Sequence, residues 1–247
     1  MQRRLRSRLA AILVLSLGGV VAAATVRAEI TLVEQLRAIA PAANPEVLGL
    51  AARAAECARR QGVLDGLNHL AVIDYSLPST QPRLWVFDLR RQRLLFEELV
   101  AHGRNTGEGF AERFSNAEGS KMSSIGLYQT ADTYYGSNGY SLRLRGLDPG
   151  FNDKALSRAI VMHGAPYVSE AIAQRLGRLG RSWGCPALRP EVARTVIDTL
   201  KGGALLFAYY PDRNWLEASP FFKCDGDGAG PTKQVVADAR PAEPHRG

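Results

Sequence analysis

Residues 69–100 have the sequence HLAVIDYSLPSTQPRLWVFDLRRQRLLFEELV, and this stretch decides the fold class. It contains three short apolar runs, at 69–75, 84–89 and 94–100, separated by turn residues. Residues 90–93 are few enough to close a hairpin between the last two runs. Short runs rich in β-branched, aromatic and leucine residues and bounded by turn signals are typical of strands. The sequence therefore predicts a sheet that begins near residue 69.

The same pattern continues beyond a long polar segment. Further strands are predicted at 125–130, 141–147, 159–163 and 204–210, and helices at 167–176 and 191–201. The polar, Gly-rich segment at 103–120 is too long for a plain connector, and segments of this kind are often lids or binding loops. We therefore expect a mainly β (α+β) fold of antiparallel or mixed sheets with a few short helices.

Two helices are predicted before the sheet. An apolar stripe at helical spacing ends at Pro41, and Asn44-Pro45 begins a second helix that Gly62 closes. They form either a packing pair or a small prodomain. The expected organisation is a leader at 1–28, a helical segment at 29–64, a main domain at 65–222 and a disordered Asp/Gly/Pro/Ala-rich tail at 223–247.

The leader has the pattern of a secretory signal peptide. It begins MQRRLRSR, continues with an apolar run from Leu9 to Ala24, and ends in small residues before Glu29. We expect cleavage after Ala28, with Ala24 as the alternative. If the segment is instead retained as an anchor helix, the rest of the chain is still exported, because arginines stay on the cytoplasmic side. The expected location is the periplasm or cell envelope.

Most of the positive charge belongs to this leader. The chain of 247 residues has a net charge of +7, from 31 Lys and Arg against 24 Asp and Glu. Five arginines and no acids lie in residues 1–28, so the remainder carries +2. A charge this small gives no basis for nucleic-acid binding. The hydrophobic content of 46% excludes wholesale disorder, and membrane contact is expected only through an uncleaved leader.

A cysteine lies on a predicted tight turn at 182–186, with the sequence SWGCP. Gly184 permits backbone conformations that other residues adopt at a cost, and Pro186 keeps Cys185 out of the α region. We therefore expect the turn to present the Cys185 sulfur rather than bury it.

His163, at the end of the predicted strand at 159–163, is a candidate base for this thiol. An imidazole that takes the thiol proton makes cysteine a nucleophile. The Gly164 carbonyl is free to accept from the second ring nitrogen of His163 and to fix its tautomer. The amides of Gly184 and Cys185 are candidate oxyanion donors. Each residue taken alone also has a purely structural interpretation. A single cysteine is often a small buried hydrophobic residue, and a single histidine is often a structural group.

The two segments together resemble a known family. His163-Gly164, a spacer and Ser182-x-Gly184-Cys185 are similar to the His-Gly…Ser-His-Gly-Cys signature of the YkuD-type L,D-transpeptidases. The closer resemblance is to the divergent murein L,D-transpeptidase branch, which shares the segments GYSLRL (139–144), GFND (150–153), VMHGA (161–165), GRLGRS (177–182) and GCPA (184–187). The resemblance covers about residues 65–212 and implies a mostly β catalytic domain.

The resemblance implies a peptidoglycan L,D-transpeptidase with Cys185 as nucleophile, His163 as base and Gly164 as its orienter. The enzyme would form a thioester with a murein tetrapeptide stem and pass it to an amine. The alternatives are an L,D-carboxypeptidase or murein peptide hydrolase that uses the same cysteine, and a non-catalytic wall-binding module. Peptidoglycan stem peptides are the expected partners, and no cofactor is expected.

Two positions depart from the family pattern. The family's more usual histidine before Gly-Cys is Trp183, which packs under the turn or against substrate. The usual Arg or Asn two residues after the cysteine is Ala187, and Arg189 is the candidate substitute.

Five residues have further roles suggested by their place along the chain. Ser182 either braces the turn or contacts substrate. Arg181, with Arg189, is a candidate for the carboxylates of stem peptides, against the alternative of a solvated face. Ser124 and Tyr128 lie where the family lines its donor site, although Tyr128 fits the core equally well.

The remaining cysteines suggest a disulfide. In an oxidising compartment, Cys57 and Cys224 either pair, which ties the N-terminal helices to the chain's end, or stay free. A zinc site from His102, His163 and Cys185 is disfavoured because paired ligand spacing is missing, so no metal is expected. A thiol redox function is disfavoured because no resolving cysteine is near Cys185.

Overall fold

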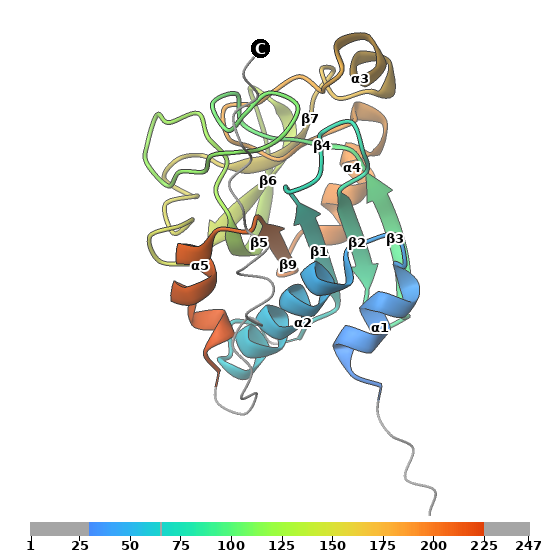
Figure 1. The fold of residues 1–247 in the computed structure, drawn as a ribbon, viewed down its shortest axis with the longest axis vertical. Coiled ribbons are helices and arrows are strands. Elements are labelled where there is room, and N and C mark those ends of the chain that lie inside the picture. The colour runs from blue at the N-terminus through green and yellow to red at the C-terminus, as the bar shows by residue number, and fades with distance from the viewer. Residues whose placement is uncertain (1–29, 65, 225–247) are drawn as a thin grey trace, which may run out of the picture. The chain divides into compact units, whose positions relative to one another are not determined.

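The computed structural model describes residues 30–64 and 66–224. Nine strands in this part of the chain form one mixed sheet in the order β3-β2-β1-β9-β5-β6-β7-β8-β4 (Figure 1). The prediction of a mainly β fold with a few short helices is confirmed. The predicted signal peptide, and all but the first two residues of the predicted tail, lie outside the described residues.

One half of the sheet is formed by β1 (His69–Asp74), β2 (Leu84–Asp88), β3 (Arg93–Glu98) and β9 (Leu205–Tyr209). β2 pairs antiparallel with both β1 and β3, and β9 pairs parallel with β1. The predicted strand at 94–100 is wrong at its end. The chain leaves β3 at Glu98, and Val100–Ala101 form a separate strand, β4, at the opposite edge of the sheet.

The other half contains β5 (Gly126–Gly136), β6 (Gly139–Gly146), β7 (Val161–Gly164) and β8 (Ala187–Leu188). β5 joins the two halves through its antiparallel pairing with β9. It is longer than the predicted 125–130 because its hairpin with β6 continues to the pair Gly136 and Gly139. β7 is antiparallel to β6 and parallel to β8, which pairs in turn with β4.

Five helices and one 3₁₀ turn complete the described chain. They are α1 (Leu32–Ile39), α2 (Pro45–Arg60), α3 (Glu170–Leu176), α4 (Pro190–Leu200), α5 (Arg213–Ala218) and η1 (Pro220–Phe222). The Asn44 side chain accepts from the Glu46 amide and begins α2, with Pro45 in its first turn. Within 30–64 and 66–224, no helix is both long and apolar enough to span a bilayer.

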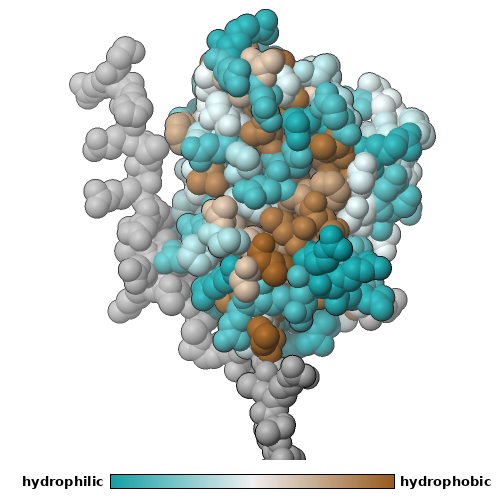
Figure 2. Space-filling model, turned by 90° about the vertical axis from the view of Figure 1, so that its right-hand side faces the viewer, coloured by the Kyte–Doolittle hydropathy of each residue, from teal (hydrophilic) through white to brown (hydrophobic). Residues whose placement is uncertain are grey.

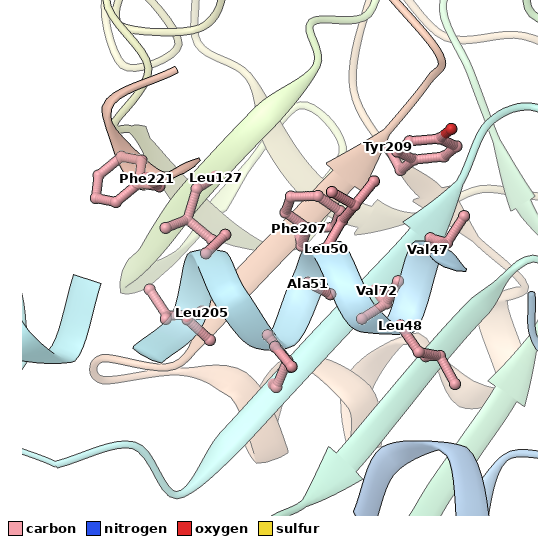
Figure 3. Close-up of a cluster of buried hydrophobic side chains, with 14 of the residues drawn as sticks. Val47, Leu48, Leu50, Ala51, Val72, Leu127, Leu205, Phe207, Tyr209 and Phe221 are labelled. Carbon is pink, nitrogen blue, oxygen red and sulfur yellow. The ribbon is translucent and has the colours of Figure 1, made fainter. Parts of the chain in front are cut away.

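Helix α2 covers one face of the sheet (Figure 3). Alternate residues of β1 point to opposite faces, so Leu70 and Val72 meet α2 while Ala71 and Ile73 face the core that contains α4. The α2 face is apolar, with buried residues that include Leu48, Leu50, Ala51, Trp85, Leu127, Leu205, Phe207, Trp215 and Phe221. The helical segment predicted at 29–64 therefore packs on the sheet, and its role as a packing pair or a prodomain stays a prediction.

A disulfide links the N-terminal helices to the end of the described chain. It joins Cys57 in α2 to Cys224, just beyond η1, with the Cα atoms 5.7 Å apart. The last described residues are therefore attached to the N-terminal helices, and the folded chain extends past the predicted boundary at 222.

Strand β3 forms an exposed edge of the sheet. Its residues Leu94, Leu95 and Phe96 are half-buried. On the side of the molecule where β3 lies, hydrophobic residues form a band between hydrophilic ones (Figure 2).

Candidate active site

Strand β7 holds His163 in a fixed place within the sheet. His163 lies opposite Ser141 of β6 and opposite Ala187 of β8. Its backbone amide donates to the Pro186 carbonyl at 3.4 Å. The parallel pairing of β7 with β8 thus brings the histidine next to the chain that carries Cys185.

The turn at 182–186 is braced from within. The Ser182 Oγ accepts from the Gly184 amide at 3.0 Å and donates to the Cys185 carbonyl at 2.6 Å. Of the two roles expected for Ser182, the structure shows the bracing one. The Gly184 amide is therefore occupied, which corrects the expectation that it is an oxyanion donor. The Cys185 amide has no acceptor among the residues described.

Gly184 lets this turn pack closely against the chain. Its φ of +124° is in the region that favours glycine. A Cβ at this position would lie 2.6 Å from the Met122 carbonyl oxygen and 2.9 Å from the Ile160 Cδ1. No larger residue fits without a shift of the 122 backbone.

The sulfur of Cys185 is buried, contrary to the sequence prediction. The residue is 8% exposed. The thiol donates to the Ala159 carbonyl at 3.7 Å, and the Sγ accepts from the Val161 amide at 3.5 Å. Gly184 and Pro186 do shape the turn, but the Cys185 side chain belongs to the buried cluster that includes Ile160. Burial raises the pKa of the Cys185 thiol, opposed by the Val161 amide and the positive charge of Arg158.

His163 is anchored as the sequence led us to expect. Its Nδ1 lies 3.0 Å from the Gly164 carbonyl oxygen. A carbonyl only accepts, so Nδ1 carries the proton and Nε2 has the free lone pair. Burial lowers the pKa of His163, partly offset by the bond to Gly164, so the imidazole is neutral at neutral pH. In the described chain, His163 is not among the hydrogen-bond partners of the Cys185 sulfur.

A hollow of about 370 Å³ brings the two residues together. Its walls are formed by Ser137, Asn138, His163, Tyr167, Arg181, Ser182, Trp183 and Cys185. Trp183 is 70% exposed at its rim, with the Lys121 Nζ 4.9 Å from the ring centroid. The indole is therefore not packed under the turn. Of the predicted site residues, the structure gathers Cys185, His163, Ser182, Trp183 and Arg181 at this hollow.

Arg181 reaches the hollow but is bonded to a neighbouring loop. Its Nη1 donates to the carbonyls of Arg104 and Gly107 at 3.1 Å and pairs with Glu108. The guanidinium thus holds the polar segment that begins at residue 103. Because its donors and its charge are already paired within the protein, Arg181 is less able to bind a substrate carboxylate.

Three predicted substrate contacts lie elsewhere. Arg189 forms a two-pronged pair with Glu98, through Nε at 2.9 Å and Nη2 at 2.7 Å, and does not line the hollow. Ser124 and Tyr128 are buried, and the Tyr128 hydroxyl donates to the Ser124 carbonyl. The expectation that Ser124 and Tyr128 line the donor site is therefore corrected, because both side chains are bonded inside the protein.

A buried polar group beside the turn was not predicted from the sequence. The Arg83 guanidinium donates to the Val100 carbonyl and to the His102 Nδ1 at 2.9 Å. The His102 Nε2 donates to the Gly107 carbonyl, so both ring nitrogens are used. Burial and the Arg83 charge lower the pKa of His102 to about 4. One signal was present, since both residues adjoin the apolar runs at 84–89 and 94–100.

No metal centre is apparent in the part of the chain that the structure describes. There, no three His, Cys, Asp or Glu side chains are grouped so as to hold an ion.

Comparison with known proteins gives one family. The family model described as "L,D-transpeptidase catalytic domain" matches residues 40–209. None of the curated proteins compared with the sequence matches it.

Several solved structures are weakly similar. An L,D-transpeptidase from Mycobacterium smegmatis is 14% identical with a TM-score of 0.36, over 59% of this chain and 60% of that one. An L,D-transpeptidase from Stackebrandtia nassauensis is 15% identical with a TM-score of 0.36, over 68% of each chain. The helical cell shape determining protein Pgp2 from Campylobacter jejuni is 16% identical with a TM-score of 0.37, over 58% of this chain and 48% of that one. The match spans about three fifths of the Mycobacterium smegmatis chain, and similarities this low assign no activity.

Proposed function

Because this chain belongs to the L,D-transpeptidase catalytic-domain family, as its motifs suggested, we propose that it is a cysteine-dependent acyltransferase that cross-links peptidoglycan. Cys185 is the nucleophile and His163 the base in this proposal. The observation that supports it most is the meeting of these two residues at one hollow, with the imidazole fixed by the Gly164 carbonyl. Family members act on peptidoglycan stem peptides, so the donor is a murein tetrapeptide stem.

The resting pair is neutral. The pKa of the thiol is raised by burial and that of the imidazole is lowered by burial. Both shifts disfavour a preformed thiolate–imidazolium pair. We therefore expect the proton to move from sulfur to the His163 Nε2 as the sulfur attacks. This step requires the thiol to turn from the Ala159 carbonyl toward the imidazole.

The first half-reaction forms a thioester. The Cys185 sulfur bonds to the carbonyl carbon of the amide between the L-centre and the terminal D-residue. The C–N bond breaks, and D-alanine leaves with the proton held by His163. The Cys185 amide is the candidate donor to the developing oxyanion, since it has no acceptor among the described residues.

The second half-reaction resolves the thioester. An acceptor amine, normally the side-chain amine of the third residue of another stem, attacks the carbonyl carbon. His163 takes a proton from this amine and returns one to the departing sulfur. If water replaces the amine, the same residues perform hydrolysis, and the protein is a carboxypeptidase or peptide hydrolase.

One observation favours a second candidate, a non-catalytic wall-binding module. The Cys185 thiol is buried and bonded to Ala159 rather than to His163. A cysteine retired from catalysis would also be held in this way. Trp183, exposed where the family usually has histidine, fits a binding surface as well as an active site.

The site of action proposed is the cell envelope outside the cytoplasm. The disulfide between Cys57 and Cys224 supports this, because such bonds persist in oxidising compartments. The basic and apolar pattern of residues 1–28 supplies the export signal in this proposal.

Product analysis tests the proposal. The purified protein is incubated with a murein tetrapeptide whose own third-residue side-chain amine is blocked, with and without an amine acceptor such as a second, unblocked stem, beside the Cys185→Ala variant. Transpeptidation predicts release of D-alanine and an acceptor-dependent cross-linked product from the wild type alone. D-alanine release independent of the amine would indicate the hydrolytic alternative. Binding of the peptide without any product from wild type or variant would indicate the non-catalytic module.

A further inference from the structure

Arg158 is held by four hydrogen bonds just before β7. Its Nη1 donates to the Ser115 carbonyl at 2.8 Å and to the Ser124 Oγ at 2.5 Å. Its Nη2 donates to the Met122 carbonyl at 2.7 Å and to the Ser120 Oγ at 3.1 Å. One guanidinium thus fixes the end of the polar segment in place.

These contacts reach the cysteine turn from one side. The Met122 carbonyl that Arg158 holds lies directly against Gly184, where an added Cβ would be 2.6 Å from its oxygen. The next residue, Ser123, donates from its hydroxyl to the Gly184 carbonyl at 3.0 Å. The segment clamped by Arg158 is therefore the surface on which the turn rests.

The same arginine adjoins the sulfur from the other side. Ala159, its neighbour in the chain, supplies the carbonyl that accepts from the Cys185 thiol. Ala159 has a φ of +52°, an uncommon conformation for a residue with a side chain. Two hydrogen bonds of the preceding turn hold it there, from the Ala159 amide to the Leu156 carbonyl and from the Ile160 amide to the Ala155 carbonyl, and Arg158 lies within that turn.

Among the titratable groups described near the Cys185 sulfur, Arg158 is the cation that interacts with it electrostatically. Tyr75 and Tyr167 both interact electrostatically with the thiol. Burial raises the pKa of each to about 12, so both are neutral at pH 7. His163 is neutral there too, because burial lowers its pKa. Arg181, at the same hollow, is paired with Glu108. Burial raises the pKa of Cys185, and the charge of Arg158 acts against that rise. Burial lowers the pKa of Arg158 itself, and Tyr128, the ionised thiol and Glu118 act against that shift.

We propose that Arg158 is a positioning residue for Cys185, which seats the cysteine turn through the clamped 120–124 segment and places a positive charge beside the sulfur when it is ionised. The inference deepens the proposed function, because it takes Cys185 as the nucleophile. In this proposal Arg158 gives the buried thiol, whose imidazole partner is neutral, a cation that favours its ionised form.

The test measures the ionisation of the thiol directly. Cys185 is the one free cysteine of the three in the chain, so alkylation by iodoacetamide at a series of pH values reports its pKa. The variants are Arg158→Gln, which removes the charge and most of the clamp, and Arg158→Lys, which keeps the charge. Lys154→Gln is the matched control, since it removes an exposed positive charge from the same loop.

Arg158→Gln is expected to raise the apparent pKa of Cys185 by about one unit and to slow alkylation at pH 7 about tenfold. Arg158→Lys is expected to keep that pKa within about half a unit of the wild type. Lys154→Gln is expected to leave both unchanged.

An unchanged thiol pKa in Arg158→Gln, or an equal rise in Lys154→Gln, would overturn the proposal. If Arg158→Gln does not fold, Arg158→Lys decides, and a rise of about a full unit there would also overturn it. The assay needs no murein substrate. A pKa shift as expected in a protein that releases no D-alanine would therefore reject the proposed function and not the placement of Arg158.

Discussion

The face under α2 and the surroundings of the Cys185 turn are built on different principles. Under α2 the clustered side chains are apolar, and they come from the strands, from α2 and from the shorter elements α1, α5 and η1. Around the turn the chain buries Arg83, His102, Ser123, His163 and Ser182. The turn region also contains unusual backbone, since Lys121 and Ala159 have positive φ values of 55° and 52° without being glycine.

The difference separates stability from chemistry. Apolar burial on the α2 face stabilises the fold and involves no group that the proposed reaction uses. Buried polar groups and uncommon backbone conformations cost free energy and are held at the turn by the rest of the structure. Substitutions on the α2 face should therefore lower the free energy of unfolding and leave the reactivity of the Cys185 thiol unchanged. Substitutions at the turn should change the reactivity of the thiol and have little effect on the free energy of unfolding.

The largest expected effect is on activity, from His163→Gln. Loss of a general base lowers rates by about 10²–10⁴-fold, and we expect a fall of this size in thioester formation with a tetrapeptide. The melting temperature should change little, because the anchored ring does not belong to the apolar core. His69→Gln, a half-buried histidine at the start of β1, is the matched control. Equal activity in the two variants would remove His163 from the mechanism.

The converse change is Phe207→Ala on the α2 face. Phe207 is fully buried and packs against Trp215, with the ring centroids 5.6 Å apart. Its truncation should lower the free energy of unfolding by about 3–5 kcal/mol, measured by denaturant titration. The alkylation rate of Cys185 in the folded variant should match the wild type. Phe110→Ala, at a residue that is 55% exposed, should change stability by less than about 0.5 kcal/mol.

The disulfide offers a smaller perturbation of the same face. It links residues 167 apart in the chain, and removing a bond that closes so long a loop typically costs about 2–4 kcal/mol. We expect Cys57→Ser/Cys224→Ser to lose stability in this range while Cys185 keeps its pH profile of alkylation. A change in that profile would show that the two regions are coupled.

The smallest expected effect is a shift in the pH dependence of kcat/KM. Since burial lowers the pKa of His163 from its ordinary value of 6.5, the imidazole keeps its free lone pair below that pH. The acid limb of kcat/KM should therefore lie below pH 6.5, where the imidazole becomes protonated and activity is lost. The pH dependence of D-alanine release measures it. An acid limb above 6.5 would mean that the imidazole is stabilised in its charged form, contrary to the burial described.

Local patterns in the sequence predicted the regular part of the molecule. The apolar run at 69–75 became β1 at His69–Asp74, and the helix predicted at 191–201 became α4 at Pro190–Leu200. The strand predicted at 159–163 begins later, at Val161, because Ala159 adopts a positive φ to reach the cysteine turn. Two local hydrogen bonds hold that conformation, from the Ala159 amide to the Leu156 carbonyl and from the Ile160 amide to the Ala155 carbonyl, and no glycine marks the turn in the sequence.

The candidate site was predictable in its identities but not in its environment. Two short motifs were enough to name Cys185 and His163, and the bond of His163 to Gly164 follows from their adjacency. The buried sulfur contacts the Ala159 carbonyl and the Val161 amide, which are distant from Cys185 in sequence and meet it only in the fold. For the same reason, Ser124 and Tyr128 were assigned to the site although both lie inside the protein.

The central claim is that the buried Cys185 sulfur becomes an acyl carrier, and the intact mass of the protein after exposure to a carbapenem tests it most directly. The account predicts a covalent mass gain on the wild type that maps to Cys185 and is missing from Cys185→Ala. An unmodified wild type, or an equal gain on the variant, would contradict it.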